Sequence, residues 1–518
     1  MLRPSAKDEF AQAAANMVVR FARKEGVVAS FELEASGNKT SFERVAGKKK
    51  EDTTPAAPEW DDYAFDTPNW PGFRGYLSRG VIENQNLPDE WDVESGKNVA
   101  WKAAIPGLGL SCPIAWGDAV FVSTAVAVDD PPEGSQLQTG LYGNVDSVED
   151  DREYAFKLFK LSLSTGKVLW ERECVTAKPA VKRHTKSSFA NPTPVTNGEF
   201  VVTHFGTEGL FCHTMSGDLV WKKDFGFLDS GWFFDRSFQW GFGASPYIHD
   251  GIVYLQCDIQ DQSFLVALDV KTGDEKWRTN RDDIPTWSSP VAYKDPSGGL
   301  RVALNGTREA AVYDGADGKR IWSLAGMSEI VVPTPQVTPN YLLLASGYRP
   351  IRPVIAVAHD AAGEFSVTED KSTAKKDDEG ESNKKPDTED SGPFVWKLDS
   401  GGSYLPTPVV YRGYVYVVSN NGVLACHDAT TGKRLSRVRL KGAGSCTGSP
   451  IAADGKLYIT SETGRTFVVP VGPKQEPLGK NEVGEAVLTT PAIAGGRLLI
   501  RGENHLFAIS RTEKPAAE

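Results

Sequence analysis

Four aspartates in the middle of the sequence raise the question of a cation site. Asp258 and Asp261 lie three positions apart, and Asp282 and Asp283 are adjacent. Calcium takes about six to eight oxygen ligands, so carboxylates from two loops could contribute to a site. Their spacing matches no known calcium loop, however, and aspartates in turns commonly cap the local backbone. We favour that second interpretation and predict no metal site.

A histidine and the cysteines are the other candidates for chemistry. His184 could act as a general base, but a histidine without a placed partner is more often a hydrogen-bonding loop residue. The six cysteines are scattered and include no C-x-x-C pair, which argues against a disulfide framework, a zinc site or a haem attachment site. Cys212 and Cys426 share one position of an internal repeat, so we expect small buried strand residues there.

The composition indicates a globular protein with many turns. The 518 residues include 50 Gly, 32 Pro and 13 Trp, which favours short strands over helices. Most of the net charge of −11 falls in two stretches: residues 129–152 carry −6 and residues 369–390 carry −4. We see no basic stripe for nucleic acid, no apolar run long enough for a transmembrane helix and no signal peptide.

One repeated unit consists of an apolar strand, an Asp/Thr/Gly turn and a second strand that usually ends in Trp. Examples are FLVALDVKTGDEKW (264–277), KLSLSTGKVLW (160–170) and AAVYDGADGKRIW (310–322). Gly in the turn supplies the positive φ that such turns need. We predict that the tryptophans pack between neighbouring sheets with equivalent burial; they are Trp101, Trp170, Trp221, Trp277, Trp322 and Trp396.

A second pattern, in which a proline follows small residues and precedes an apolar strand, gives the number of repeats. Its prolines are Pro113, Pro194, Pro246, Pro290, Pro335, Pro408, Pro450 and Pro491. The short gaps match the period of about 40–45 residues of four-stranded propeller blades. The two long gaps hold insertions at about 127–153 and 360–392. The second insertion is almost free of apolar residues, so we expect disorder there, with recruitment of a partner as the alternative.

These patterns predict an all-β fold, an eight-bladed propeller of four-stranded antiparallel blades over residues 61–512. The last repeat supplies only three strands, and NVAWKAAIPG (98–107) can supply the fourth and close the ring. Residues 513–518 form a tail. Residues 1–60 form a short α/β appendage and linker, with helical spacing over 8–24 and a hairpin after it.

The segment NWPGFRG (69–75) comes just before the closing strand. We predict that it is a structural plug where the ring is sealed; a ligand-binding role for Arg74 is the alternative. On the blade register, one mouth of the channel collects His184, Lys186, Glu208, Trp240, Asp258, Trp287, Arg308, Tyr348, Arg349, Tyr404, Asn420, Asn421, Glu462 and Glu503.

Two interpretations of this mouth remain open. Aromatics, arginines and carboxylates around one funnel could bind a ligand or an extended peptide. Loops at such a mouth are also polar simply because they meet water. For the first interpretation the candidate ligand-binding residues are His184, Trp240, Asp258, Trp287, Arg308, Arg349 and Tyr404.

The repeats resemble those of the PQQ-repeat propellers, also called the quinoprotein-alcohol-dehydrogenase-like superfamily. It includes PQQ-dependent alcohol dehydrogenases and the non-enzymatic outer-membrane assembly protein BamB. The stretch from NWPGFRG to SCPIAWGDAVFVSTA, together with IPTWSSPV and TTPAIAGGRLLIRGENHLFAI, is similar to PQQ-like propellers abundant in planctomycete bacteria. The resemblance runs from about residue 69 to 511 and concerns the fold more than the activity.

The resemblance implies two alternative functions. One is a non-catalytic, monomeric scaffold in the periplasm or cell envelope that binds a protein or peptide at one propeller face. The other is a PQQ-dependent alcohol or sugar oxidoreductase with calcium. The family's enzymes use a vicinal Cys pair, a metal held by carboxylates and a catalytic Asp, whereas this chain has no adjacent cysteines. No complete motif supports PQQ or calcium, so we favour the scaffold and predict no catalytic residue.

Overall fold

The computed structural model describes residues 3–6, 9–12, 17–24, 27–35, 38–43, 68–129, 137–140, 147–367 and 392–511. The chain divides into two compact units, Met1–Ala56 and Ala57–Glu518. The predicted linker at 47–58 and the tail at 513–518 lie outside the described residues.

The smaller unit is a single antiparallel sheet, and the predicted helix over 8–24 is wrong. Its strands in order are β1 (Arg3–Ala6), β2 (Glu9–Gln12), β3 (Met17–Lys24), β4 (Val27–Ala35) and β5 (Asn38–Glu43). In β3 the buried Val19 alternates with Arg20, and the Phe21 ring lies 5.9 Å from the Phe31 ring of β4. Antiparallel pairing with β4 along Met17–Lys24 overrides the helical spacing. The predicted hairpin is confirmed as the β4–β5 pair.

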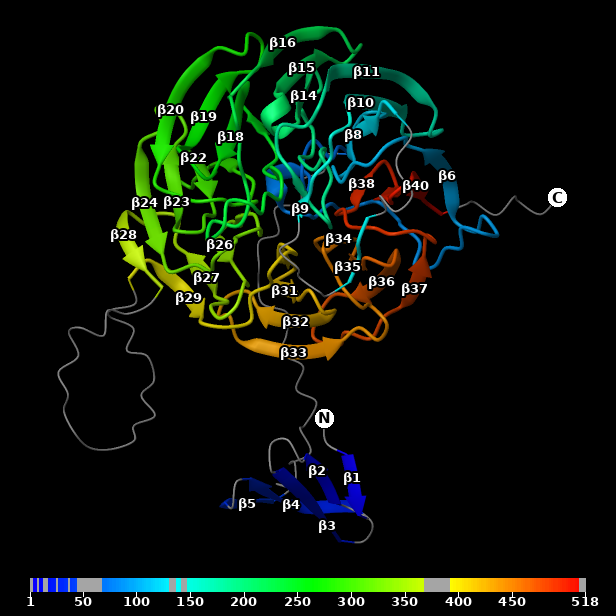
Figure 1. The fold of residues 1–518 in the computed structure, drawn as a ribbon, viewed down its shortest axis with the longest axis vertical. Coiled ribbons are helices and arrows are strands. Elements are labelled where there is room, and N and C mark those ends of the chain that lie inside the picture. The colour runs from blue at the N-terminus through cyan, green and yellow to red at the C-terminus, as the bar shows by residue number, and fades with distance from the viewer. Residues whose placement is uncertain are drawn as a thin grey trace. The chain divides into compact units, whose positions relative to one another are not determined.

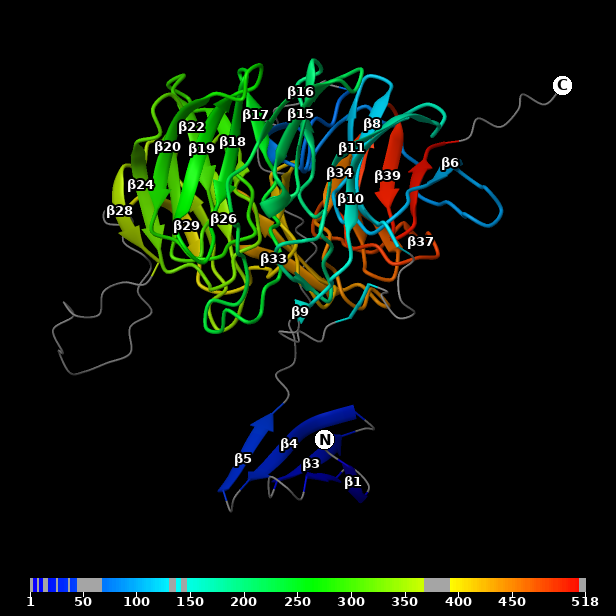
Figure 2. The same cartoon turned by 45° about the horizontal axis from the view of Figure 1, so that its top comes forward.

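The larger unit contains, among its described residues, eight sheets that share a four-stranded antiparallel plan. Figure 1 and Figure 2 show these sheets following one another around a common centre. The prediction of an all-β unit built from such sheets is confirmed.

The first four sheets take their strands in sequence order. Sheet 1 consists of β7 (Ile114–Trp116), β8 (Ala119–Ala127), β10 (Tyr154–Ser162) and β11 (Val168–Ala177). Sheet 2 consists of β13 (Val195–Thr196), β14 (Phe200–His204), β15 (Leu210–Thr214) and β16 (Leu219–Lys223). Sheet 3 consists of β17 (Tyr247–His249), β18 (Ile252–Cys257), β19 (Ser263–Asp269) and β20 (Glu275–Arg281). Sheet 4 consists of β21 (Val291–Lys294), β22 (Leu300–Leu304), β23 (Glu309–Asp314) and β24 (Arg320–Ala325).

The next four sheets follow the same plan. Sheet 5 consists of β25 (Gln336–Val337), β26 (Leu342–Ala345), β27 (Val354–Val357) and β29 (Phe394–Leu398). Sheet 6 consists of β30 (Val409–Tyr411), β31 (Tyr414–Val418), β32 (Val423–Asp428) and β33 (Arg434–Arg439). Sheet 7 consists of β34 (Ile451–Ala453), β35 (Lys456–Thr460), β36 (Arg465–Pro470) and β37 (Gly479–Glu482). Sheet 8 consists of β38 (Ala492–Ala494), β39 (Arg497–Arg501), β40 (His505–Ile509) and β6 (Val99–Ala104).

Strand β6 comes first in the sequence of the larger unit, yet it is the fourth strand of sheet 8. The last repeat supplies only the other three strands, β38, β39 and β40. It pairs antiparallel with β40, and Trp101 lies opposite Ala508. In Figure 1 the blue β6 accordingly lies beside the red β40.

Burial along the strands shows how the sheets pack. The inner strands are apolar on both faces; every residue of β31 is buried, for example. The outermost strands alternate, as in β20, because only one of their faces meets a neighbouring sheet. Apolar clusters accordingly extend across adjacent sheets, and the largest combines residues of sheets 1, 7 and 8.

The two insertions are partly described. In the second, residues 363–366 form β28 (Gly363–Ser366), which pairs parallel with β24 as a fifth strand of sheet 4. The prediction of disorder is therefore wrong for these residues, where Phe365 covers Trp322 at 6.2 Å between ring centres; residues 368–391 lie outside the described part. In the first insertion, β9 (Ser147–Val148) pairs with β12 (Arg183–His184).

The repeated tryptophans connect consecutive sheets. Each of five indole N–H groups donates to a backbone carbonyl of the following sheet's turn region, at 2.8 to 3.2 Å; the pairs are Trp101 to Leu163, Trp170 to Met215, Trp221 to Val270, Trp277 to Gly315 and Trp396 to Ala429. The turn glycine fits under the ring: a Cβ on Gly432, at φ +70°, would lie 2.6 Å from Trp396. This contact explains why the Gly and the Trp repeat together.

The prediction of equivalent burial is wrong for these tryptophans. Trp101, Trp322 and Trp396 are buried, whereas Trp170, Trp221 and Trp277 keep part of their surface exposed. Trp322 differs because β28 covers it from outside. The register does place Cys212 opposite Trp221, and Ala267 opposite Trp277, so the predicted repeat position of Cys212 is correct.

Candidate functional site

A ring of hydrogen bonds surrounds the central axis of the larger unit. The residue before each repeat proline donates its backbone N–H to the side chain of the equivalent residue in the next sheet, at 2.9 to 3.3 Å. The Thr490 N–H completes the series by donating to the Cys112 sulfur at 3.2 Å. The members of this hydroxyl ring are Cys112, Thr193, Ser245, Ser289, Thr334, Thr407, Ser449 and Thr490.

Sequence reasoning found the prolines of this pattern but missed the ring. Seven of the eight prolines follow a Ser or Thr and the eighth follows Cys112. A hydroxyl at a fixed position before each proline was the signal available, because such a side chain can accept the N–H of a neighbouring chain segment.

The segment after Asn69 lies against the inner strands of several sheets. Trp70 exchanges two backbone hydrogen bonds with Ala115 at 2.8 Å, and the Pro71 carbonyl accepts the Thr196 N–H. Further along, the Gly80 carbonyl accepts the Ala452 N–H at 2.7 Å. These contacts with sheets 1, 2 and 7 support the predicted role of NWPGFRG as a plug.

Arg74 is the centre of this plug and is fully buried. Its guanidinium donates to the carbonyls of Ser78, Arg79, Pro408 and Pro450 and to the Gln336 side-chain oxygen, at 2.9 to 3.3 Å. All five acceptors are neutral. Burial lowers the pKa of Arg74 to about 9, so the charge persists at neutral pH. The alternative role in direct ligand binding does not fit a side chain with no exposed surface.

Above the plug lies a cavity of about 820 Å³. Phe73 and the hydroxyl ring except Thr334 line its inner part, and loops from several sheets line its mouth. Five of the seven predicted ligand-binding residues line this cavity: His184, Trp240, Trp287, Arg349 and Tyr404.

Aromatic side chains are paired around the mouth. The rings of Trp240 and Trp287 lie 5.6 Å apart at 38°, and His184 meets Trp240 edge-on at 5.7 Å. The Tyr348 and Tyr404 rings lie 5.3 Å apart. His184 Nδ1 accepts the Lys186 N–H at 3.0 Å, which fits a hydrogen-bonding loop residue better than a general base.

Asp258 and Arg308, the other two predicted ligand-binding residues, do not line the cavity. Asp258 is fully buried and accepts hydrogen bonds from Arg281 at 2.8 and 3.3 Å. Arg308 is half exposed and pairs with Asp282. Their assignment to the mouth is therefore wrong, because a buried ion cluster satisfies Asp258 and a surface ion pair satisfies Arg308.

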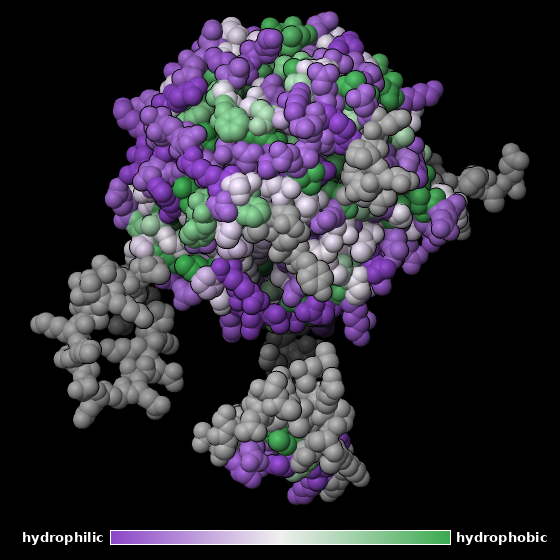
Figure 3. Space-filling model, viewed as in Figure 1, coloured by the Kyte–Doolittle hydropathy of each residue, from purple (hydrophilic) through white to green (hydrophobic). Residues whose placement is uncertain are grey.

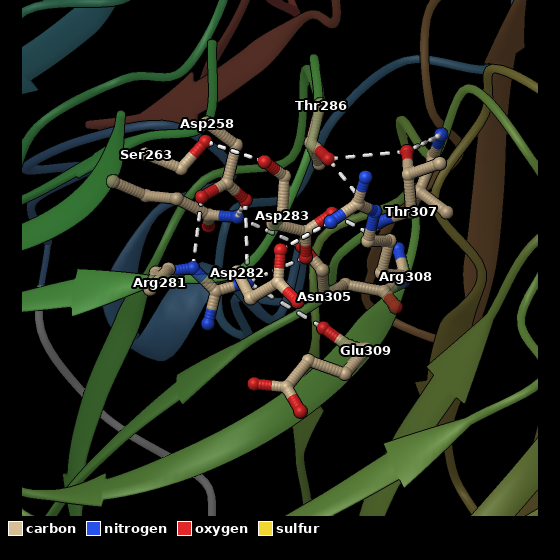
Figure 4. Close-up of polar contacts among 12 residues, drawn as sticks. Asp258, Ser263, Arg281, Asp282, Asp283, Thr286, Asn305, Thr307, Arg308 and Glu309 are labelled. Atoms are coloured by element: carbon tan, nitrogen blue, oxygen red, sulfur yellow. Dashed lines mark hydrogen bonds and ion pairs between the residues drawn. The ribbon is translucent and has the colours of Figure 1, made fainter. Parts of the chain in front are cut away.

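Figure 4 shows this cluster, in which Arg281 lies between Asp258 and Asp283. Arg281 also donates to the Tyr313 hydroxyl at 2.7 Å, which connects sheets 3 and 4. Asp283 accepts the N–H groups of Ile284 and Arg308 at 2.9 Å. Burial, followed by the nearby Asp258 charge, raises the pKa of the Asp283 carboxyl.

The four aspartates do not gather around a cation. Asp258 and Asp283 share Arg281, Asp261 pairs with Arg236, and Asp282 pairs with Arg308. Within the residues that the structure describes, no three His, Cys, Asp or Glu side chains come together as metal ligands would.

Residues 137–140 of the first insertion form a short strap beside the cavity, and Gly140 lines it. Gly140 donates its N–H to Glu462 at 2.7 Å, and Lys186 bonds both the Glu462 carboxylate and the Gly140 carbonyl at 2.7 Å. The Leu137 N–H donates to Glu503 at 3.3 Å. Glu462 also accepts the Ser445 and Thr447 hydroxyls, so its carboxylate is fully engaged in holding the strap.

The cavity carries the opposite charge from the protein as a whole. Its described lining includes Lys186, Arg349 and Arg352 but no Asp or Glu. The chain's net charge is −11. In Figure 3 hydrophilic residues predominate around the periphery of the larger unit, with smaller hydrophobic areas among them.

Comparisons with known proteins place the fold. The family model described as outer membrane protein assembly factor BamB matches residues 155–390 and 215–471. The BamB of Burkholderia pseudomallei is 30% identical over 110 residues, which cover 21% of this chain and 28% of that relative, so the match spans less than a third of its length.

Two solved structures share the fold at low identity. A europium-containing methanol dehydrogenase has a TM-score of 0.51 and 10% identity, covering 85% of this chain and 91% of that one. Quinohemoprotein alcohol dehydrogenase ADHIIG from Pseudomonas putida HK5 has a TM-score of 0.51 and 11% identity, covering 87% of this chain and 82% of that one. No helix in the described residues is long and apolar enough to span a membrane.

Proposed function

The chain belongs to the BamB-like family of PQQ-repeat propellers, and we propose that it is a non-catalytic member that binds a protein or peptide partner at the face that carries the cavity. In this proposal residues 61–512 form one closed eight-bladed propeller. Support for closure comes from the β6–β40 pair and from the hydroxyl ring, whose hydrogen bonds run through all eight sheets and return to Cys112.

The composition of the cavity mouth carries the proposal of partner binding. Trp, Tyr and Arg dominate the energetics of protein interfaces, and Trp240, Tyr404 and Arg349 line this mouth. Arg349 is exposed, and Trp240 and Tyr404 keep part of their surface accessible. A peptide segment could therefore bury aromatic surface here and pair with an arginine.

The same cavity fits the chemistry of the family's enzymes poorly. The paired rings of Trp240 and Trp287 suit a planar quinone, but the described lining offers no carboxylate for a divalent cation or for a general base. Glu462, an acid that contacts lining residues, is already engaged with Lys186 and two hydroxyls. The residues present therefore do not fit a metal-assisted quinone oxidation.

Family membership also suggests the cellular location. The matched family is named for outer membrane protein assembly, so we place the protein in the cell envelope. Fractionation of the native host tests this: recovery of the chain in the cytoplasmic fraction alone contradicts it.

Selection of peptides on the immobilised full chain tests the partner surface. We expect selected peptides to bind wild type and to lose at least about tenfold in affinity with Trp240→Ala or Arg349→Ala. The matched control is Leu219→Ala, an exposed apolar residue of the outer strand β16, which should leave affinity unchanged. Peptides that bind both mouth variants as tightly as they bind wild type would contradict the proposal.

The enzymatic alternative deserves a direct test because the Trp240–Trp287 pair could flank a planar cofactor. The full chain is incubated with PQQ and calcium and assayed for dye-linked alcohol oxidation. We expect no turnover. Robust turnover that is lost in Trp287→Ala would replace the scaffold with a quinone-dependent dehydrogenase.

A further inference from the structure

Five hydroxyls of the ring are donors that have no acceptor: Ser245, Ser289, Thr334, Thr407 and Ser449. Each of its seven hydroxyl oxygens accepts a backbone N–H. The hydroxyls of Thr193 and Thr490 hydrogen-bond the Cys112 thiol. The other five O–H groups donate to no other residue within the described part of the chain. These side chains are only 1 to 5% exposed, so bulk water satisfies them poorly, and a buried donor without a partner is costly.

Six of these seven hydroxyl residues line the inner part of the cavity; Thr334 is the exception. The four among them that have no acceptor, Ser245, Ser289, Thr407 and Ser449, come from different repeats and line one cavity together with Phe73. Convergent O–H donors match a ligand that is rich in acceptors.

The charges around this space favour an anion. The described lining contains no carboxylate. Its Lys186 is paired with Glu462, and neither Arg349 nor Arg352 forms an ion pair with any described residue. Behind the ring, the fully buried Arg74 keeps a positive charge that five neutral oxygens share. A cationic, low-dielectric pocket in an acidic protein concentrates anions.

We propose that the inner cavity is a binding site for a small oxyanion, a phosphate or carboxylate group, held by the ring hydroxyls with the arginines supplying the opposite charge. Hydrogen bonds to a charged acceptor are shorter and stronger than neutral ones. A neutral polyol could use the same hydroxyls but gains nothing from the guanidinium charge. The site lies deeper than the proposed partner surface and does not depend on it.

Calorimetric titration of the full chain with inorganic phosphate tests the proposal, with citrate as the carboxylate probe and glycerol as the neutral one. We expect saturable one-to-one binding of phosphate or citrate that weakens with added salt, and none of glycerol. Whichever anion binds more tightly identifies the group. Binding of glycerol alone, or no anion binding at millimolar concentrations, overturns the proposal.

Substitutions in the ring give a matched set. Thr407→Val removes one donor and should weaken anion binding at least about tenfold, while Thr407→Ser retains the hydroxyl and should bind as wild type does. The control is Ser419→Ala: Ser419 also lines the cavity, but its hydroxyl already donates to Asn421 at 2.6 Å. Equal losses in Thr407→Val and Ser419→Ala overturn the role of the ring.

Two further variants keep the test decisive if Thr407→Val folds poorly. Cys112→Ser replaces the one weak thiol donor of the ring with a hydroxyl and should tighten binding severalfold. Arg352→Gln removes a charge from the lining and should weaken it severalfold. Unchanged affinity in both, with melting temperatures equal to wild type, overturns the proposal without reference to any peptide partner.

Discussion

The hydroxyl ring and the cavity mouth border the same cavity but are built in opposite ways. In the ring, a Ser or Thr recurs at one position of seven repeats and Cys112 takes this position in the eighth, and each member bonds the next. At the mouth, Trp240, Trp287 and Tyr404 occur once each, on loops that differ in length and sequence. The repeated positions hold the sheets together, whereas the single positions give this propeller its own surface.

Arg74 and Arg281 qualify this contrast, because both occur once and yet are buried deep in the structure. Arg281 shares its charge with two carboxylates, whereas Arg74 is held by carbonyls and one amide. A residue that is not part of the repeat can therefore still be structural. Arg74 bonds carbonyls of two sheets at once, and Arg281 joins the neighbouring sheets 3 and 4.

Truncation of a repeated tryptophan should have the largest effect on stability. Trp396 is 8% exposed and donates to Ala429 in the next sheet at 2.9 Å. We expect Trp396→Ala to lower the free energy of unfolding by about 3–5 kcal/mol, measured by denaturant titration. Trp277→Ala, at a more exposed equivalent position, should cost less; equal costs would show that burial does not govern this position.

Replacement of Arg74 should come next. Arg74→Met removes five hydrogen bonds and leaves the carbonyls of Pro408 and Pro450 buried without donors. Because buried acceptors without partners each cost about 1–3 kcal/mol and some can find water, we expect a loss of about 3 kcal/mol. Thermal unfolding measures it. A Met variant as stable as wild type would show that the plug does not hold the inner strands.

The ion cluster should give a smaller, pH-dependent effect. The folded state raises the pKa of Asp283 above its usual value, so the folded protein binds this proton more tightly than the unfolded chain. Stability contributed by that proton is present at low pH and is lost as pH rises from about 4 through the raised pKa. Asp283→Asn should reduce the change in the free energy of unfolding over this pH range by about 1–2 kcal/mol. The melting temperature of both proteins is measured against pH. Equal slopes for wild type and variant would contradict the prediction.

The smallest effect on stability is expected at the mouth. Arg349 is exposed and has no ion pair among the described residues. Arg349→Gln should therefore change the free energy of unfolding by no more than about 0.5 kcal/mol, while it weakens peptide binding. A large loss of stability, measured by denaturant titration, would place Arg349 among the structural residues and erase the contrast with the ring.

The sequence predicted the repeated parts well, because period and strand alternation are local signals. The prolines marked the sheets, and the missing strand of the last repeat led to β6. The leader was misjudged because Phe10, Met17 and Phe21 fit a helical spacing that strand pairing overrides, of β2 with β3 and of β3 with β4. Asp258 was misplaced because nothing local shows that Arg281, 23 positions away, neutralises it.

The plug has a kinetic consequence. The segment from Trp70 to Gly80 is bonded to the inner strands of several sheets, and its Phe73 lines the cavity. We infer that this segment closes one end of the cavity. On this inference, a ligand that enters past Trp240 leaves by the same route. A partner seated on the mouth would then slow the arrival and the escape of a small ligand by the same factor, and so prolong its stay without changing its equilibrium affinity.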